Sequence, residues 1–377
     1  LLLPEFAEDV VTLTERKLGG LRPWAWGPDS VELFTPLFAN ITATQRPTDH
    51  LFNERIAQLY TKAWSAALLR KILPLLSPEP WLFTEFEVGV MPNSVKAVLE
   101  AIAAIRSRGH HKVVLKESIG VAGSNALRLF EPELTENQKR WIANVIASGR
   151  EIVVEPWLER ELDFSVQLEM KAAGLELVGY TGLLNDAKGQ FIGNWAEPKF
   201  ERKLPAGVTS SLGVVPAAGN PVQRLYEEIL AALELALRAV DFLGPLGIDA
   251  FVYRDATGLG RLKPIVEINP RYTMGRVTVE LMSRAAQGSH GLFRLFNRAS
   301  LRAEGCEDFV SFGQRLREKF PLSFSSDPAR RIAEGAVCLN DPQQAQVCLA
   351  VFQVFRCAAD LQRCVGIASG AFVKDSR

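Results

Sequence analysis

The sequence predicts a mixed α/β (α+β) fold made of two lobes. Amphipathic helical segments alternate with short apolar strands along the chain, and several strands follow one another across turns, as antiparallel neighbours do. Residues 156–161 combine a proline with charged side chains and interrupt a run of strand character, which indicates a hinge between the lobes. With 377 residues, the chain is long enough for two or three domains with substantial cores.

The first part of the chain predicts two helices separated by a short strand. Residues 52–73 carry apolar side chains at helical spacing, which predicts one continuous amphipathic helix. Residues 81–88 can form a strand. Residues 93–109 predict the next helix, which Asn93 or Ser94 would cap.

A buried strand and a glycine-containing loop are expected next. The apolar run from Val113 to Leu115 predicts a strand that ends at Lys116. A loop with Gly120 and Gly123 follows and leads into another strand at residues 125–130.

The second half of the chain predicts strands, a long helix and a hairpin. Strand character returns on both sides of the hinge, and residues 175–205 predict a strand pair. Asn220 and Pro221 predict the cap and the first turn of a long helix. Residues 247–255 and 262–270 then predict an antiparallel hairpin joined by a glycine-rich turn.

Composition and charge argue against several classes of protein. Nearly half of the residues are apolar, no stretch approaches the roughly 18 consecutive apolar residues of a membrane helix, and the formal net charge is zero. We therefore expect neither a membrane-spanning protein nor a nucleic-acid binder, since the latter usually carries a basic surplus. The chain starts with acidic rather than basic residues near its apolar end, which is unlike a signal peptide, and without Met, so we expect a cytoplasmic protein with a truncated or processed beginning.

The cysteines predict neither a metal site nor a redox pair. They lie in the last fifth of the chain without any C-x-x-C sequence, at Cys306, Cys338, Cys348, Cys357 and Cys364. We expect reduced, buried thiols that fill small apolar spaces in a reducing cytoplasm.

The most informative polar cluster stands at the end of the predicted hairpin, in "EINPR". Side chains alternate across a strand, so Glu267 and Asn269 share one face, and Asp249 on the preceding strand can lie opposite Glu267. Two facing carboxylates repel each other unless a cation lies between them, and hard oxygen ligands suit Mg²⁺ or Mn²⁺. The alternative is a solvated face of the hairpin, on which acidic residues are common.

Lys116 is the second candidate. It ends a buried strand immediately before the glycine loop, which can bring an ammonium group and backbone N–H groups close to phosphate oxygens. The alternative is a solvated lysine at a strand end. The chain lacks the P-loop sequence G-x-x-x-x-G-K-[ST], and "GLGRLK" does not match the dinucleotide fingerprint G-x-G-x-x-G.

Taken in order, these residues resemble the ATP-grasp superfamily. Its members carry a lysine on an early helix, a second lysine before a glycine-rich loop, an acidic hinge, and a late strand pair that ends in E-x-N. The resemblance covers about residues 60–280, and its most specific part is E-I-N-P-R after the "GID" strand. It implies two α+β lobes that clasp a nucleotide, within four regions: an N-terminal segment (1–80), a first lobe (81–156), a second lobe (157–300) and a C-terminal extension (301–377).

The resemblance also implies which residues bind ATP and metal. The nucleotide-binding residues would be Lys62, Lys116, Gly120, Gly123, Ser124, Glu155, Trp157, Leu158 and Asp163. Among these, the hinge residues 155–158 would face adenine, Asp163 would lie near the ribose, and the others would meet phosphates. The ligands of Mg²⁺ or Mn²⁺ would be Asp249, Glu267 and Asn269. Arg271 would reach the γ-phosphate and, with Lys116, act in catalysis.

Most members of the superfamily join a carboxylic acid to an amine or thiol through an acyl phosphate. The resemblance therefore implies an ADP-forming ligase whose partners are small-molecule carboxylate and amine substrates, with amino acids or small peptides favoured. A phosphotransferase and a catalytically inactive nucleotide-binding scaffold remain open, as does an accidental match of ordinary strand-end residues. The C-terminal extension would cap the second lobe or form a subunit contact, which leaves a homodimer open.

Two further groups carry alternative interpretations. Trp24 and Trp26 precede a helix that Asp29 or Ser30 would cap; they either line a ligand or, as burial habits favour, pack in the core. The basic residues of "EPKFERK", at 197–203, either hold an anionic part of the substrate or form a solvated surface, which is the commoner case.

Overall fold

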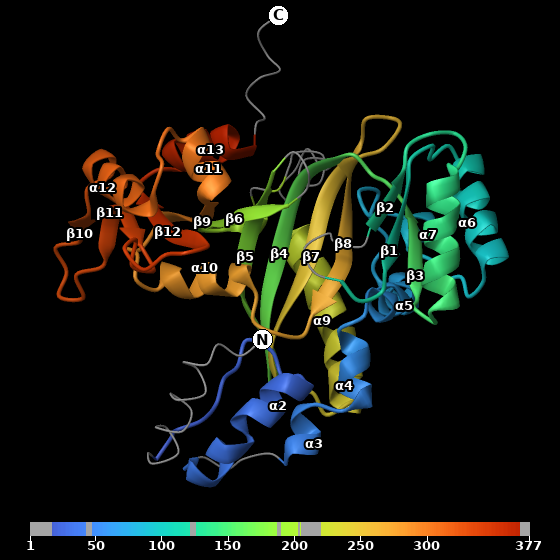
Figure 1. Ribbon diagram of the computed structural model, residues 1–377, viewed down its shortest axis with the longest axis horizontal. Helices are drawn as coiled ribbons and strands as arrows, with labels where there is room; N and C mark the ends of the chain where they lie inside the picture. Colours follow the sequence, from blue (N-terminus) through green and yellow to red (C-terminus); the bar gives the residue numbers. More distant parts are fainter. Residues whose placement is uncertain are drawn as a thin grey trace, which may run out of the picture.

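The chain builds two β-sheets that lie side by side (Figure 1). The computed structural model describes residues 17–42, 47–120, 126–186, 190–202, 204 and 220–369. One sheet has three strands in the order β2-β1-β3, and the other has nine in the order β10-β11-β12-β9-β6-β5-β4-β7-β8. Neighbouring strands in both sheets are antiparallel throughout the part of the chain that is described. This is the mixed α+β architecture that the sequence predicts.

Short helices form the N-terminal segment. They are α2 (Pro28–Phe34), α3 (Thr48–Leu51), α4 (Glu54–Leu59) and α5 (Lys62–Ile72), with the 3₁₀ turns η1 (Thr35–Asn40) and η2 (Leu73–Leu75). The single helix predicted over residues 52–73 is wrong, because Thr61 leaves the helical conformation and caps α5. The Thr61 hydroxyl accepts a hydrogen bond from the backbone N–H of Trp64 at 3.1 Å.

The predicted cap of the helix after Trp26 is also wrong, by two or three residues. Helix α2 begins at Pro28 after the N-cap residue Gly27, whereas we expected Asp29 or Ser30 to cap it. Proline suits the first helical position because its missing N–H would have no intrahelical partner there. The Ser30 hydroxyl instead lies inside the first turn and accepts a hydrogen bond from the Gly27 N–H at 2.8 Å.

The three-stranded sheet and two helices form the smaller lobe. Its elements are α6 (Val95–Ser107), β1 (Val113–Glu117), β2 (Ala126–Leu129), α7 (Glu136–Ala147) and β3 (Ile152–Pro156). Apolar side chains of both helices pack on those of the strands in one separate core. Ser94 caps α6, as predicted, and β1 and β2 confirm the predicted strands on either side of the loop. The strand expected at residues 81–88 is instead a 3₁₀ turn, η3 (Glu85–Glu87), after an isolated bridge at Leu82, because the Glu87 carboxylate turns back to the Thr84 N–H at 2.6 Å.

The centre of the large sheet confirms the strands and the long helix predicted for the second half of the chain. Its elements are β4 (Arg160–Lys171), β5 (Gly174–Asn185), β6 (Phe191–Ala196), α9 (Pro221–Ala239), β7 (Gly244–Arg254) and β8 (Gly260–Asn269), with the turn η4 (Phe200–Arg202). The chain crosses from the small sheet to the large one between Pro156 and Arg160, where the sequence predicts a hinge. Asn220 caps α9, and its side chain accepts from the Val222 N–H at 2.9 Å.

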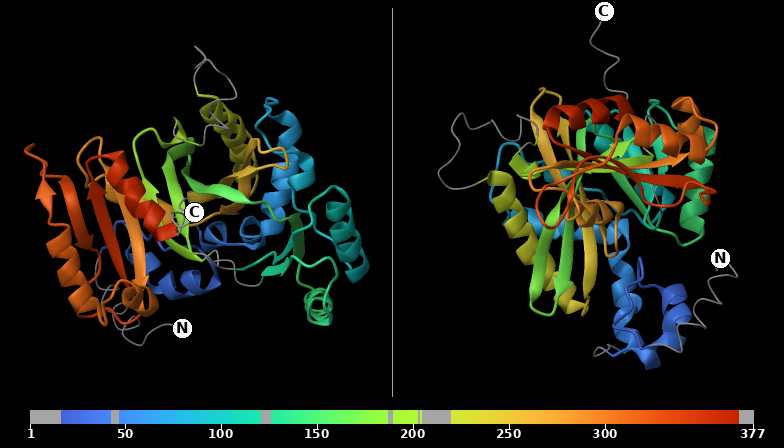
Figure 2. Two further views of the ribbon diagram at one scale, coloured as in Figure 1. Left: turned by 90° about the horizontal axis from the view of Figure 1, so that it is seen from above. Right: turned by 90° about the vertical axis from the view of Figure 1, so that its left-hand side faces the viewer.

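The C-terminal part continues the large sheet. Its elements are α10 (Met274–Met282), β9 (His290–Asn297), α11 (Arg298–Ala303), α12 (Phe309–Lys319), β10 (Ser323–Phe324), β11 (Ile332–Cys338), β12 (Cys348–Phe355) and α13 (Ala358–Ser369). These strands and the small sheet lie at opposite ends of the molecule (Figure 2). The expected boundary at residue 300 thus falls within one continuous sheet, and the division into four regions stays a prediction.

No helix among the described residues is long and apolar enough to cross a membrane. The five cysteines are free thiols, but only Cys306 is buried and Cys357 is exposed, so the expectation that all of them fill buried spaces is wrong.

Candidate active site

Two carboxylates meet at the end of the β7–β8 hairpin. Asp249 on β7 lies directly opposite Glu267 on β8, as predicted, although the register of the two strands shifts between this pair and the pairs nearer the turn. The Asn269 amide donates to Asp249 Oδ2 at 3.1 Å, so all three predicted metal ligands lie together. Arg271 follows on the same stretch, and its guanidinium donates to Asn269 Oδ1 at 2.9 Å and to the Tyr272 carbonyl at 3.1 Å.

The electrostatics of Asp249 reflect this crowding. Burial, and next the negative charge of Glu267, raise the pKa of the Asp249 carboxyl to about 6, although hydrogen bonds from Ser165 and Asn269 and the charge of Arg271 oppose the shift. Within the described residues, no group of three His, Cys, Asp or Glu side chains is placed to hold a metal. A cation here would therefore combine two carboxylates with an amide oxygen, a hard donor set that fits Mg²⁺ or Mn²⁺.

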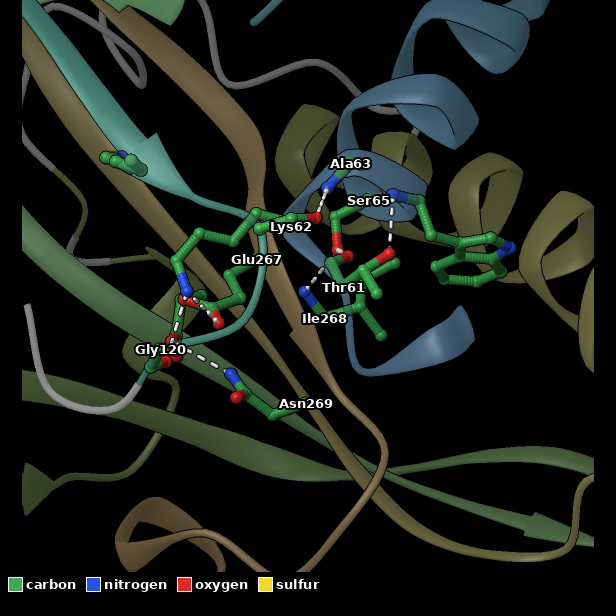
Figure 3. Close-up of polar contacts among 12 residues, drawn as sticks. Thr61, Lys62, Ala63, Ser65, Gly120, Glu267, Ile268 and Asn269 are labelled. Carbon is green, nitrogen blue, oxygen red and sulfur yellow. Dashed lines mark hydrogen bonds and ion pairs between the residues drawn. The ribbon is translucent and has the colours of Figure 1, made fainter. Parts of the chain in front are cut away.

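Lys62 connects helix α5 to this carboxylate pair. Its ammonium group donates to Glu267 Oε1 at 3.0 Å and to the carbonyl of Gly120 at 3.2 Å (Figure 3). The Lys62 backbone N–H also bonds the Ser118 carbonyl at 2.8 Å, which fixes the start of the glycine loop to the start of α5. A further bond, from the Ile268 N–H to the Ser65 hydroxyl at 3.0 Å, fastens β8 to the same helix (Figure 3). The early lysine and the late E-x-N sequence thus come together, as the resemblance implies.

Lys116 lies deeper in the same region, beside Glu155. Its ammonium group makes an ion pair with Glu155 Oε1, and Lys263 Nζ lies 2.8 Å from Glu155 Oε2. Burial lowers the pKa of Lys116, although the neighbouring Glu155 charge opposes the shift. Lys263 belongs to β8, on the same face as Glu267, and it was not among the predicted site residues. The alternation that selects Glu267 and Asn269 also selects Lys263, and a lysine within an otherwise apolar strand was the available signal.

A small cavity joins these groups. It is lined by Lys62, Ala66, Leu69, Val88, Gly89, Lys116, Val153, Glu155, Lys263, Ile265, Val266 and Glu267. The lining comes from α5, both strands β1 and β3 of the small sheet, and β8 of the large sheet. Its space for water is about 20 Å³, room for a single molecule. The cavity therefore combines three ammonium groups and two carboxylates with apolar walls, between the two sheets.

The remaining hinge residues are placed as follows. The Trp157 N–H donates to the Lys112 carbonyl at 2.9 Å, and Leu158 is buried in the main core. Asp163 lies on β4 opposite Phe251, with Arg160 2.9 Å away and Asn185 at 3.4 Å. Contacts of these residues with adenine or ribose stay predictions. Gly123 and Ser124 of the predicted phosphate loop lie outside the described residues.

The N-terminal segment passes beside Arg271. The Tyr272 N–H donates to the Trp24 carbonyl at 2.9 Å, and the two rings lie 6.3 Å apart. Trp24 remains 44% exposed, whereas Trp26 packs on Phe34 and Phe38. The packing alternative therefore describes Trp26, and Trp24 is the one that is open to a ligand.

Sequence comparison gives no relative for this chain, while comparison of structures does. No family model and no curated protein matches it. N5-carboxyaminoimidazole synthetase from Staphylococcus aureus, complexed with ADP, superposes with a TM-score of 0.50 and 9% identity, over 90% of this chain and 77% of that one. The biotin carboxylase of Campylobacter jejuni, in a β-γ-ATP complex, gives 0.50 and 11% over 91% and 73%.

A third structure is a domain dimer. The biotin carboxylase domain of 2-oxoglutarate carboxylase from Hydrogenobacter thermophilus, in complex with MgADP, ADP and bicarbonate, has a TM-score of 0.50 and 13% identity, over 96% of this chain and 76% of that one. These similar structures are ATP-grasp enzymes, and at such identities the likeness concerns architecture. The chain therefore has the ATP-grasp fold.

Proposed function

We propose that this protein is an ATP-dependent ligase that joins a carboxylate to an amine through an acyl phosphate and releases ADP and phosphate. The observation that carries this proposal is the facing pair Asp249 and Glu267, with Asn269 and Lys62 bonded to them. Binding a nucleotide base alone requires no such pair. Transfer of a phosphoryl group uses such a pair, because the cation that the pair would hold neutralises negative charge around the transferred group.

Asp249, Glu267 and Asn269 would hold Mg²⁺ or Mn²⁺. The fit rests on the oxygen donors, which are two facing carboxylates and the amide oxygen of Asn269. When bound, the cation supplies neutralisation of charge on the phosphate oxygens. To bind the cation, Asn269 Oδ1 would have to release the hydrogen bond that it accepts from Arg271, and this release would free the guanidinium for the substrate.

The basic residues would position the reacting groups. Lys62 and Lys116 would bind phosphate oxygens of ATP, and both now bond carboxylates that an anionic ligand can replace. Arg271 presents a planar fork, which can hold two oxygens of the γ-phosphoryl group and then of the acyl phosphate. The amine would attack the acyl carbon and expel phosphate.

Entry of a nucleotide requires rearrangement of the cavity. With about 20 Å³ of space, the present cavity holds a water molecule and no purine ring. Lys116 and Glu155 belong to neighbouring strands of the small sheet and form an ion pair in the lining, and we expect this pair to separate when a phosphate enters. The smaller lobe contributes both groups, and it packs as its own core, separate from the core of the large sheet.

The proposed substrates are amino acids or small peptides. Their carboxylate would meet Arg271, which donates to the Tyr272 carbonyl. The 44% exposed Trp24 ring lies 6.3 Å from the Tyr272 ring and would offer aromatic surface for the rest of the molecule. Aromatic rings accept both apolar and cationic groups, so this wall does not by itself select one side chain.

Isotope transfer tests the reaction directly. The protein is incubated with ATP, Mg²⁺ and pools of amino acids or dipeptides, and ADP release is followed. With an acid labelled by ¹⁸O in its carboxylate, an acyl phosphate passes one labelled oxygen to phosphate when the amine attacks. We expect ADP, labelled phosphate and a new amide. A phosphorylated product whose phosphoryl group carries no label would indicate a phosphotransferase, and AMP release would contradict the proposed chemistry.

A further inference from the structure

Glu155 lies between two lysines that belong to different sheets. Lys116 comes from β1 of the small sheet and bonds one carboxylate oxygen, and Lys263 comes from β8 of the large sheet and bonds the other at 2.8 Å. Each oxygen of the carboxylate thus has its own ammonium group. Glu155 is the only described residue shared by both ion pairs.

The cluster carries one more positive charge than negative charge. Two ammonium groups face one carboxylate, and the charges of Lys116 and Lys263 hold the pKa of Glu155 well below its usual range, overcoming a burial that by itself would raise it. The neighbouring pair of Lys62 and Glu267 is neutral in sum. Removal of Lys263 would leave this cluster with one ammonium group for its one carboxylate.

Of the two lysines, Lys263 is the one fixed in place. Its side chain is 3% exposed, and its ammonium group also donates to the Glu87 carbonyl at 2.9 Å. Lys116 has an 18% exposed side chain, and the only hydrogen bond described for its ammonium group is the one to Glu155. An incoming anion can therefore take Lys116 from Glu155 at the loss of one described bond, whereas it would have to break two to take Lys263.

We infer that Lys263 is a positioning residue for nucleotide binding, which holds and neutralises Glu155 so that Lys116 can pass from that carboxylate to a phosphate of ATP. This inference rests on the proposed function, since it names the partner that Lys116 leaves. Without Lys263, the departure of Lys116 would strand a buried, unpaired carboxylate, which is strongly unfavourable. Lys116 would then stay on Glu155, and the nucleotide would lose its phosphate contact.

A double-mutant cycle on the full chain tests this exchange. Binding of ATP with Mg²⁺ is measured by calorimetry for the wild type, Lys263→Met, Glu155→Gln and the double variant. We expect Lys263→Met to weaken binding at least about tenfold, and the added Glu155→Gln to restore it to within about threefold of Glu155→Gln alone. Lys171→Met, which removes an exposed lysine paired with Glu176 on the large sheet, is the matched control and should bind as the wild type does.

The outcomes separate the inference from the proposed function. If the wild type fails to bind ATP, the proposed function fails and this inference with it. If the wild type binds ATP and Lys263→Met binds equally well, or if Glu155→Gln does not restore binding, the inference alone is overturned. Should Lys263→Met not fold, Glu155→Gln and the double variant decide: equal affinities support the inference, and weaker binding by the double variant contradicts it.

Discussion

Asp249 and Glu267 occupy directly opposed positions of one antiparallel hairpin, so two carboxylates meet in the middle of β7 and close to the end of β8. Like charges at opposed positions of a sheet destabilise the pairing. Lys62 offsets part of this cost by bonding Glu267, and Asn269 offsets part by bonding Asp249. The hairpin keeps this arrangement next to the lysines of the cavity.

The raised pKa of Asp249 predicts a pH-dependent stability of the metal-free protein. The pKa of Asp249 is about 6 in the folded protein, whereas the pKa of an aspartate in an unfolded chain is about 3.9. Between these two pKa values, the folded state keeps a proton on Asp249 that the unfolded state has lost. The free energy of unfolding therefore falls as the pH rises towards 6, and it stays lower above pH 6. We expect the Tm of Asp249→Asn, relative to the wild type, to increase from pH 5 to pH 8. A Tm difference that is constant with pH would contradict the shift.

Replacement of Lys62 should weaken ATP binding. Lys62→Met removes an ammonium group from the phosphate site and leaves the partly buried Glu267 carboxylate without its partner. We expect about a tenfold or greater loss of affinity for ATP with Mg²⁺ in calorimetry, together with a lower Tm. Lys71→Met, which removes an exposed lysine from the last turn of the same helix, is the matched control. Equal affinities of the two variants for ATP would show that Lys62 does not take part in ATP binding.

Arg271→Lys should separate binding from turnover. A lysine keeps the positive charge but cannot hold two oxygens in the planar geometry of a guanidinium. We expect ATP affinity to stay within about threefold of the wild type, while ADP release with the substrate pair falls by about a hundredfold. Arg284→Lys, an exposed position beyond α10, controls for the substitution itself. Unchanged turnover in Arg271→Lys would exclude the proposed role of the guanidinium.

Replacement of Gly89 should disturb the packing at the wall of the cavity. A Cβ at this position would overlap Val153 Cγ1, and it would also stand 3.6 Å from Glu155 Oε2. Gly89→Ala should therefore destabilise the protein by about 1–3 kcal/mol in denaturant unfolding. The added change Val153→Ala removes the overlapping methyl group, so the two effects should be less than additive. Gly20→Ala, whose Cβ would meet nothing within 4 Å, is the control. Strict additivity would show that the overlap relaxes freely.

The pairing of Asp249 with Glu267 was predicted, but the turn alone does not set it. A short turn joins β7, which ends at Arg254, to β8, which begins at Gly260, and Gly258 there adopts a φ of +82°. The pairs next to the turn place Phe251 opposite Lys263, and continued without a shift they would place Ile265 opposite Asp249. A register shift between Asp249 and Phe251, with three residues of β8 against one of β7, brings Asp249 opposite Glu267 instead, and side-chain alternation puts Asn269 on the same face. The same rule would have selected Lys263, but its acidic partner lies on another sheet and 108 positions away in sequence.

Contacts between distant segments could not be derived from spacing. Lys62 and Glu267 are 205 positions apart, and only the resemblance to a known fold placed them in one site. The division of the first long helix escaped prediction because Thr61 keeps the apolar periodicity intact while its hydroxyl offers a new cap. Helix α7 could have been found, since Thr135 and Gln138 form a capping box that the sequence displays.

Calorimetry of ATP binding to the wild type and to Glu267→Gln tests the central claim most directly. Glutamine keeps the size of the side chain but removes the negative charge that would bind a divalent cation. We expect the wild type to bind ATP only with Mg²⁺ or Mn²⁺. We expect the affinity of Glu267→Gln for ATP to be lower by about tenfold or more. Glu176→Gln, an exposed glutamate on the same sheet, serves as the control. Failure of the wild type to bind ATP, or equal binding by Glu267→Gln, would contradict a nucleotide and metal site at the end of this hairpin.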